Sequence, residues 1–346
     1  MKNQKIIFIT IGPAGYSRSW VYYARLQEII PNLYFVRLNP KNLIVQILKL
    51  RRKFPHNSVF VVMSPSQYLV IPIRIFLSKK IITDFGWSLY EGTKISRGIT
   101  GIPAAKSFLF DYFAAKLSCY IVLESKKQSD YFIGLFKTKR DKCKVVYTGL
   151  NEKDFVPNQK HKLHKDIFNN SKIVLYRGIY NPEGGLEILA ETTKILATKD
   201  ITFWIYAPGL PNSIEFSKNT IIDRNYYPAD IIAKLQSTCA ISLGQLSNHE
   251  RLSRTIPHKA FEAAFLAKPY ITGRTQGILE LFNEGTEIIC FKPGNSDDLA
   301  KAIMEVLNNK PLANTLGENM KKKYNKQLTQ ANLANQFLKI IEELVE

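Results

Sequence analysis

The segment Arg254 to Thr272, RTIPHKAFEAAFLAKPYIT, places two charged residues in an otherwise apolar helix. Pro257 suits the first position of that helix, and Thr255 precedes it as a candidate cap. The free N–H groups of a first helical turn attract anions, and Lys259 would add a full positive charge there. Glu262 follows on the same flank, roughly 4.5 Å further along the axis, where its carboxylate can accept both hydroxyls of a ribose.

This spacing fits a nucleoside diphosphate, with its phosphates at the helix start and its ribose one turn later. We place Thr255 and Ile256 in the same predicted nucleotide-binding turn. The structural alternative is an exposed ion pair between Lys259 and Glu262, worth a few tenths of a kcal/mol. Pro269 ends the helix and leads into a short strand, because proline cannot continue a helix.

A second candidate loop, GPAGYSRSW, follows the first strand-like run. Gly12 and Gly15 allow a sharp turn and a close approach of the backbone to a ligand. Open parallel sheets bind ligands at this edge, beyond the carboxyl ends of their strands. The spacing is not GxGxxG, so it does not support a nicotinamide cofactor. The alternative is an ordinary turn between strand and helix.

Strand-like runs alternate with amphipathic stretches along the chain, from KIIFITI and SWVYYARLQEII onward. Alternation with β-branched strands predicts an α/β fold with parallel sheets covered on both faces. Residues 151–172 are polar and form the best linker candidate. We therefore expect two Rossmann-like domains facing across a cleft, at 1–165 and 166–325. A C-terminal helix at 326–346 is expected to pack back on the first domain.

Composition and charge narrow the function. The four cysteines of the 346 residues are scattered without zinc-ligand spacing, so we expect reduced thiols in a cytoplasmic protein and no metal centre. The first residues lack the apolar h-region of a secretory signal, so we expect no signal peptide. The most apolar run, Tyr68 to Leu77, is too short for the roughly 20 residues of a membrane span. Of the net charge of +19, nearly all falls in residues 1–150, with 24 Lys and Arg against 7 Asp and Glu.

That basic half predicts an anionic partner, with solvated helix faces as the alternative. It contains no recognised RNA or DNA module, so we do not expect nucleic acid. Lys106 and Lys116 flank four aromatic residues, which favours docking at an anionic membrane leaflet. Those aromatic residues are Phe108, Phe110, Tyr112 and Phe113.

The segment ITDFGWSLYEG follows the fourth strand-like run and lies at the predicted ligand edge. An acceptor sugar would stack on Trp87 and Tyr90 and hydrogen-bond to Asp84. A core tryptophan is the alternative for Trp87.

Taken together, these motifs resemble the retaining GT-B glycosyltransferases of family 4, which have two Rossmann-like domains. Their pattern P-x-K-x-x-E is matched by Pro257, Lys259 and Glu262, and their K-P-x-I by residues 268–271. CKVVYTGLNEKDFVP resembles the end of the family's first domain, and the resemblance extends over residues 120–307. It implies transfer of a hexose-type sugar from a nucleotide-diphosphate donor, without a metal or other cofactor. The implied acceptor is a saccharide or a polyprenyl-linked saccharide of bacterial surface-polysaccharide assembly, which places the protein peripherally on the inner leaflet.

The chain also departs from that family. Arg254 stands where a sugar-contacting carboxylate usually precedes the second Glu, and we assign Arg254 and Glu262 as the catalytic pair. The usual diphosphate-binding Arg and Lys fall at Ile179 and Gly184. Arg177 is the predicted substitute, and the alternatives are Arg224, Arg251 and Arg254. These departures leave open a degenerate, non-catalytic GT-B protein that only binds or scaffolds.

Overall fold

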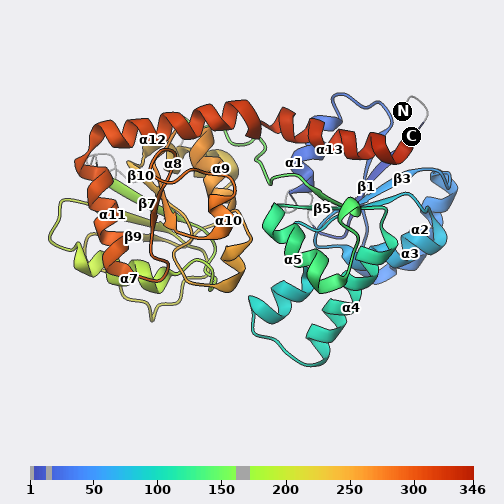
Figure 1. Cartoon of the computed structure of the whole chain (residues 1–346), viewed down its shortest axis with the longest axis horizontal. Coiled ribbons are helices and arrows are strands. Elements are labelled where there is room, and N and C mark those ends of the chain that lie inside the picture. Colours follow the sequence, from blue (N-terminus) through green and yellow to red (C-terminus); the bar gives the residue numbers. More distant parts are fainter. Residues whose placement is uncertain (1–3, 13–17, 161–171) are drawn as a thin grey trace. The chain divides into compact units, whose positions relative to one another are not determined.

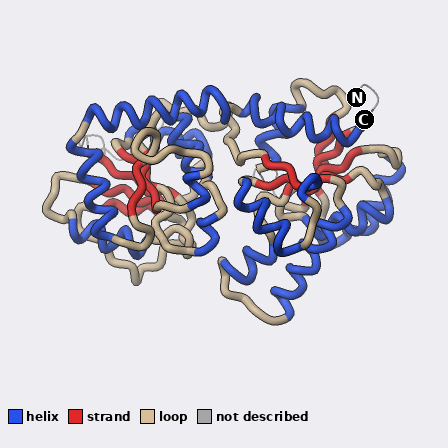
Figure 2. The backbone as a smooth tube through the Cα atoms, viewed as in Figure 1, coloured by secondary structure: helices blue, strands red, loops and turns tan. Residues whose placement is uncertain are grey.

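A computed structural model of the chain describes residues 4–12, 18–160 and 172–346. The chain divides into two compact units, residues 1–149 with 329–346, and residues 150–328. Within the described residues, each unit holds a six-stranded parallel sheet covered by helices (Figures 1 and 2). The predicted α/β fold with two Rossmann-like domains is therefore confirmed. The expected boundary at residue 165 lies outside the described residues.

The sheet of the first unit has the strand order β2-β1-β3-β4-β5-β6. Its strands are β1 (Ile6–Thr10), β2 (Leu33–Arg37), β3 (Val59–Val62), β4 (Ile81–Asp84), β5 (Tyr120–Leu123) and β6 (Cys143–Val145). Its helices are α1 (Ser19–Leu26), α2 (Leu43–Lys53), α3 (Val70–Phe76), α4 (Ile102–Leu117), α5 (Lys126–Phe136) and α13 (Gln330–Val345).

Alternate side chains of these strands fill two separate cores. Ile7 and Ile9 of β1 pack with residues of α2, α3, α4 and α5. Ile6 and Phe8 pack with α1 and α13 on the other face. Phe337 of α13 belongs to that second core, so the last helix of the chain completes the first unit. Both sheet faces are covered, which explains why the strands are apolar throughout.

The sheet of the second unit has the order β12-β11-β10-β7-β8-β9. Its strands are β7 (Ile173–Arg177), β8 (Thr202–Tyr206), β9 (Thr220–Asp223), β10 (Ile241–Leu243), β11 (Tyr270–Gly273) and β12 (Ile289–Phe291). Its helices are α7 (Leu186–Ile195), α8 (Ala229–Thr238), α9 (His258–Phe265), α10 (Gln276–Leu279), α11 (Ser296–Asn308) and α12 (Lys310–Lys323). The sequence pattern does not predict β9, because this short edge strand is only half-buried.

A buried carboxyl group ties α4 to the segment after β4. Asp111 is fully buried, and its Oδ2 accepts hydrogen bonds from Ser88 Oγ at 2.6 Å and from the Tyr90 amide at 2.8 Å. Burial raises the pKa of Asp111 to about 7, although both hydrogen bonds oppose that shift. Between about pH 4 and 7 the folded chain therefore holds a proton that the unfolded chain releases.

We expect the free energy of unfolding to fall as pH rises through this window, by up to roughly 1.4 kcal/mol per pH unit from this group. Asp111→Asn removes the titration. From pH 5 to pH 8 the variant is expected to gain on the order of 2 kcal/mol of stability relative to wild type, measured by urea unfolding. Asp130→Asn is the matched control, because the Asp130 side chain is 53% exposed. Equal pH dependence of wild type and Asp111→Asn would contradict this assignment.

Candidate functional site

The predicted nucleotide-binding helix is α9, and it begins one residue later than expected. Pro257 is its N-cap in extended conformation, with no side-chain cap, and His258 is the first helical residue. Pro257 at the first helical position and Thr255 as cap are therefore both wrong. Thr255 is half-buried and Ile256 is buried, so Thr255 is the more open of the two in this turn.

Glu262 is buried and ionised. Only 2% of the residue is exposed, and Glu262 Oε2 accepts a hydrogen bond from Arg177 Nε at 2.7 Å. Its Oε1 contacts Arg177 Nη2 and, at 2.9 Å, His258 Nδ1. Burial alone would raise the pKa of Glu262, but the charge of Arg177 and the contact with His258 lower it to about 2. The alternative of a surface pair with Lys259 is excluded by this arrangement.

Lys259 is also buried and points toward the strand ends. Its Nζ donates to the Gly244 carbonyl at 3.0 Å and to Gln245 Oε1 at 3.2 Å, and lies 3.9 Å from the centre of the Tyr176 ring. Burial, followed by the nearby charge of Arg177, lowers its pKa well below the usual value. Both side chains of α9 are therefore buried, but they contact different groups. Glu262 contacts Arg177 and His258, whereas Lys259 contacts Gly244 and Gln245.

Two glycines explain how the site accommodates these side chains. A Cβ at Gly184 would lie 2.3 Å from the Tyr176 hydroxyl, so the Lys that the family carries here has no room. Gly178 has a φ of 154°, which favours glycine, and its Cα lies close to the Lys259 side chain. The Lys259 amine and the backbone at Gly184 thus both lie beside Tyr176.

Arg254 lies close to this group in sequence but has different partners. It is 7% exposed, and its guanidinium contacts the Glu250 carbonyl at 3.4 Å and Glu250 Oε1 at 3.5 Å. Arg251 Nη1 reaches Glu183 Oε1 at 3.3 Å. Glu262, Lys259 and Arg177 thus converge, whereas a catalytic role for Arg254 beside Glu262 stays a prediction.

Sequence reasoning missed three residues of this cluster. His258 stands four positions before Glu262, a spacing that places both on one helix face and would have revealed it. Tyr176 and Gln245 meet Lys259 only through the fold, and no local pattern indicates them.

In the first unit, the predicted acceptor-binding residues lie in different surroundings. Tyr90 lines a cavity of about 550 Å³, and Lys94 Nζ donates to its hydroxyl at 2.9 Å. Trp87 is half-buried against Gly92, where an added Cβ would lie 1.9 Å from the indole ring. The amide of Gly12 donates to Thr10 Oγ1 at 3.0 Å, and Gly15 lies outside the described residues.

Asp84 is fully buried and already paired with basic and hydroxyl groups, and its assignment to acceptor binding stays a prediction. It has no exposed surface, and its Oδ1 accepts from Arg18 Nε at 2.8 Å while Ser19 Oγ donates to Oδ2. Arg18 Nη1 also donates to the Val146 carbonyl at 2.6 Å. The sequence position after a strand is right for a ligand edge, but the carboxylate is already engaged in joining β4 to α1 and β6.

Asp84→Ala is expected to destabilise the protein by about 3 kcal/mol, because it leaves Arg18 buried without its counter-charge. Asp130→Ala is the matched control, since that aspartate forms an exposed pair with Arg140, with side chains 53% and 75% accessible. The control should cost less than about 1 kcal/mol. Both are measured by urea unfolding at pH 7, and equal losses would contradict a structural role specific to Asp84.

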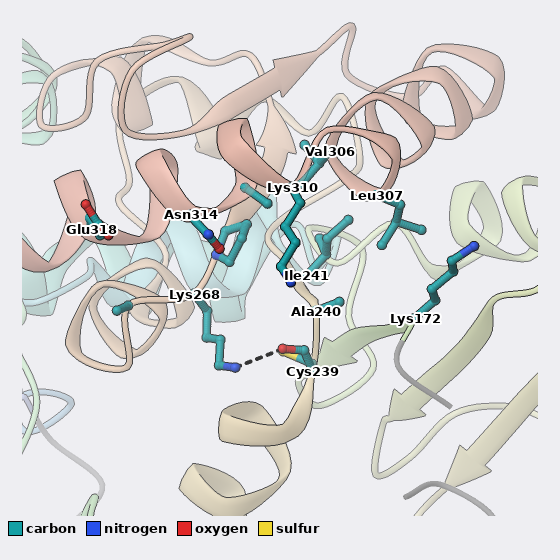
Figure 3. Close-up of a pocket in the computed structure, with 13 residues that line it drawn as sticks. Lys172, Cys239, Ala240, Ile241, Lys268, Val306, Leu307, Lys310, Asn314 and Glu318 are labelled. Atoms are coloured by element: carbon teal, nitrogen blue, oxygen red, sulfur yellow. Dashed lines mark hydrogen bonds between the residues drawn. The ribbon is translucent and has the colours of Figure 1, made fainter. Parts of the chain in front are cut away.

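The described parts of the chain contain further hollows but no cluster suited to a metal. A pocket of about 510 Å³ lies at the amino ends of β10 and β11. Figure 3 shows Lys268, Lys310 and Cys239 among the residues that line it. Lys268 Nζ donates to the Cys239 carbonyl at 2.9 Å there. This edge is opposite to the one that carries Arg177. Among described residues, no group of three His, Cys, Asp or Glu side chains is arranged for a metal ion, and metal independence stays a prediction.

Comparison with known proteins points to one class. The family described as "Glycosyl transferase-like" matches residues 186–339, which include the whole of α9. An uncharacterized glycosyltransferase of Methanocaldococcus jannaschii is 24% identical over 244 residues, 65% of this chain and 66% of that protein. The matched part therefore spans slightly less than two thirds of this relative.

Solved structures agree on the fold. A glycosyltransferase from Rickettsia africae superposes with a TM-score of 0.73 at 15% identity, covering 99% of both chains. Anabaena HepE in complex with UDP and glucose gives a TM-score of 0.68 at 15% identity, covering 99% of this chain and 100% of HepE. The chain has the GT-B fold. Together these findings support a glycosyltransferase.

The GT-B fold alone does not show which unit binds which substrate, because a fold does not determine a function. The family match lies mainly in the second unit, where Glu262, Lys259 and Arg177 converge. Family 4 membership and the retaining outcome therefore belong to the proposal below.

Proposed function

We propose that this protein transfers a sugar from a nucleoside-diphosphate donor, bound by the second unit, to a saccharide or lipid-linked saccharide acceptor. The observation that carries the proposal is the buried, ionised carboxylate of Glu262 on the first turns of α9. An ionised acid beside a helix start and two basic side chains suits a ribose next to a diphosphate. Arg177 provides the positive charge, and the Lys259 amine provides a further hydrogen-bond donor.

In this proposal Arg177 changes partner when the donor binds. Its guanidinium, 19% exposed, swings from Glu262 toward the diphosphate, and the carboxylate is released to accept the ribose hydroxyls. Basic groups and helix amides then stabilise the leaving nucleoside diphosphate without a metal ion. We further propose a retaining, hexosyl-type transfer of the family 4 kind, with Trp87 and Tyr90 beside the acceptor.

Thermal shift with nucleotide sugars tests the donor site. UDP and UDP-glucose are the first probes, because HepE structures contain them, followed by the GDP, ADP and CDP series. A ligand at 100 times its Kd is expected to stabilise by about 2.7 kcal/mol, and the shift should be unchanged in EDTA. If no nucleoside diphosphate raises the melting temperature, the donor site is refuted.

A non-catalytic binding protein is the second candidate. It is favoured by Arg254 in place of the usual carboxylate and by the pairing of Arg177 with Glu262. Donor binding without either hydrolysis or transfer, measured as released nucleoside diphosphate with and without saccharide acceptors, would favour this candidate over the enzyme.

A further inference from the structure

Three helices of the first unit present a surface that is basic and apolar but not acidic. α2, α3 and α4 cover the same sheet face, and α3 packs against both of its neighbours (Figure 1). Residues 29–83, which include α2 and α3, contain nine Lys and Arg and no Asp or Glu. The single acid of α4, Asp111, is buried. We call the outward side chains of these helices the α2–α4 face. They are Ile44, Val45, Leu48, Lys49, Arg52, Arg74, Ile75, Ile102, Lys106, Leu109, Phe113 and Lys116.

On α4 these side chains form one continuous stripe. Ile102, Leu109 and Phe113 are 84%, 51% and 42% exposed. Lys106 and Lys116 stand between and after them at helical spacing, so all five share one side of the helix. Solvated helices normally place large apolar side chains on the opposite side, toward the core. This stripe therefore mixes apolar and positive groups on the side that faces away from the protein.

The same mixture continues on α2 and α3. Ile44, Val45 and Leu48 of α2 are 61%, 56% and 44% exposed, beside Lys49 and Arg52. On α3, Ile75 is 67% exposed. Single exposed apolar residues are ordinary, but a set gathered on three packed helices indicates a partner.

Basic groups of this face contact carbonyls and rings, which leaves their charge in place. Lys116 Nζ donates to the Lys137 carbonyl at 2.9 Å, and Arg74 Nη1 donates to the Lys79 carbonyl at 2.6 Å. Lys106 Nζ lies 5.8 Å from the centre of the Phe110 ring. The field of the face is thus positive.

The aromatic residues that the sequence suggested for membrane contact are mostly not the ones exposed. Phe108 packs against Tyr90 and Phe136, with ring centres 5.3 and 5.2 Å away. Phe110 packs against Tyr68. Of the four aromatic residues, only Phe113 is exposed. The structure therefore changes which apolar residues could contact a membrane, but Lys106 and Lys116 remain exposed as expected.

We propose that the α2–α4 face binds an anionic lipid bilayer surface, with its lysines and arginines at the lipid phosphates and its aliphatic groups among the upper acyl chains. An anionic bilayer complements both features at once. A second copy would bring two positive faces together, and nucleic acid would leave the apolar groups unused. No described helix is long and apolar enough to span a bilayer, so the contact proposed is peripheral. The proposal does not depend on the donor site.

Sedimentation with vesicles tests the proposal, using 30 mol% phosphatidylglycerol in phosphatidylcholine and, in parallel, pure phosphatidylcholine. We expect the full chain to bind the anionic vesicles in 100 mM NaCl and to be released by 500 mM NaCl. The variant K49Q/R52Q/K106Q should bind on the order of 100-fold more weakly, since each basic residue near the surface contributes about fivefold. The variant I102S/L109S/F113S should also bind more weakly and be released at lower salt.

Control variants separate the face from the overall positive charge. K199Q/K292Q/K301Q removes three exposed lysines from the second unit and should bind like wild type. All substituted side chains are exposed, and unchanged melting temperatures verify folding. UDP-glucose binding should be the same in every variant, so failure here and failure of the proposed donor site are distinguishable.

Three results would overturn the proposal. The first is equal binding to anionic and neutral vesicles, or to neither. The second is an equal loss in the control variant. The third is that the face variants still bind vesicles but lose another interaction of the wild type. That interaction would be dimerisation, seen in analytical ultracentrifugation, or binding of a duplex oligonucleotide.

Discussion

Replacing Glu262 with alanine is expected to lower kcat/KM for sugar transfer by roughly 1000-fold, because two hydrogen bonds from the ribose to a charged acceptor are lost. Only 2% of the residue is exposed, so water cannot easily replace the lost carboxylate. Donor affinity, measured by calorimetry with UDP or whichever nucleotide gives the largest thermal shift, should fall with it. The affinity for inorganic pyrophosphate should change much less, since the diphosphate meets the basic groups.

Two controls make this result specific. Glu262→Gln keeps the shape and one acceptor oxygen, and should retain more affinity than the alanine variant. Glu305→Ala removes an exposed acid of α11 and should leave kcat/KM within about twofold. Assays are run well below each melting temperature. Undiminished nucleotide affinity in a folded Glu262→Ala protein would refute the ribose contact.

Much of this arrangement is predictable from local pattern. Alternating strands and helices give the parallel sheets, because buried β-branched runs and 3.6-residue periodicity are short-range signals. The spacing of Pro257, Lys259 and Glu262 predicts that both charged residues leave one helix toward one edge. The helix start differs by one residue, since Pro257 adopts the extended conformation of a cap.

A local sequence pattern cannot identify interaction partners that are distant in the sequence. Glu262 meets Arg177, 85 residues earlier, and Asp84 meets Arg18, 66 residues earlier. A carboxylate after a strand looks the same in sequence whether it faces a ligand or a buried arginine. Local pattern also cannot show that Tyr90 lines a cavity while Asp84 pairs with a buried arginine.

Arg177→Met is expected to destabilise the protein by about 3 kcal/mol, because Glu262 would remain buried with only His258 as partner. The sign of the pH dependence should also change. In wild type the pKa of about 2 means that the pair contributes stability above the unfolded pKa and loses it only as pH falls toward 2. Without Arg177, burial raises the pKa of Glu262, so stability should fall as pH rises from about 5 to 8.

The double variant R177M/E262M distinguishes a structural pair from one kept for a ligand. Replacing both charges with apolar groups of similar length should restore stability to within about 1 kcal/mol of wild type, giving a coupling energy above roughly 2 kcal/mol. Nucleotide binding should stay lost. R274M/E284M, at a more exposed pair of the same unit, should show coupling below about 1 kcal/mol.

If R177M/E262M is stable but does not bind nucleotide, the fold tolerates an apolar pair at this position. The ion pair would then serve donor binding and not folding. If the double variant is as unstable as R177M, the pair instead holds β7 to α9. In that case Arg177 would not be available to change partners, and the proposed movement toward the diphosphate would be wrong even though Glu262 remained at the nucleotide.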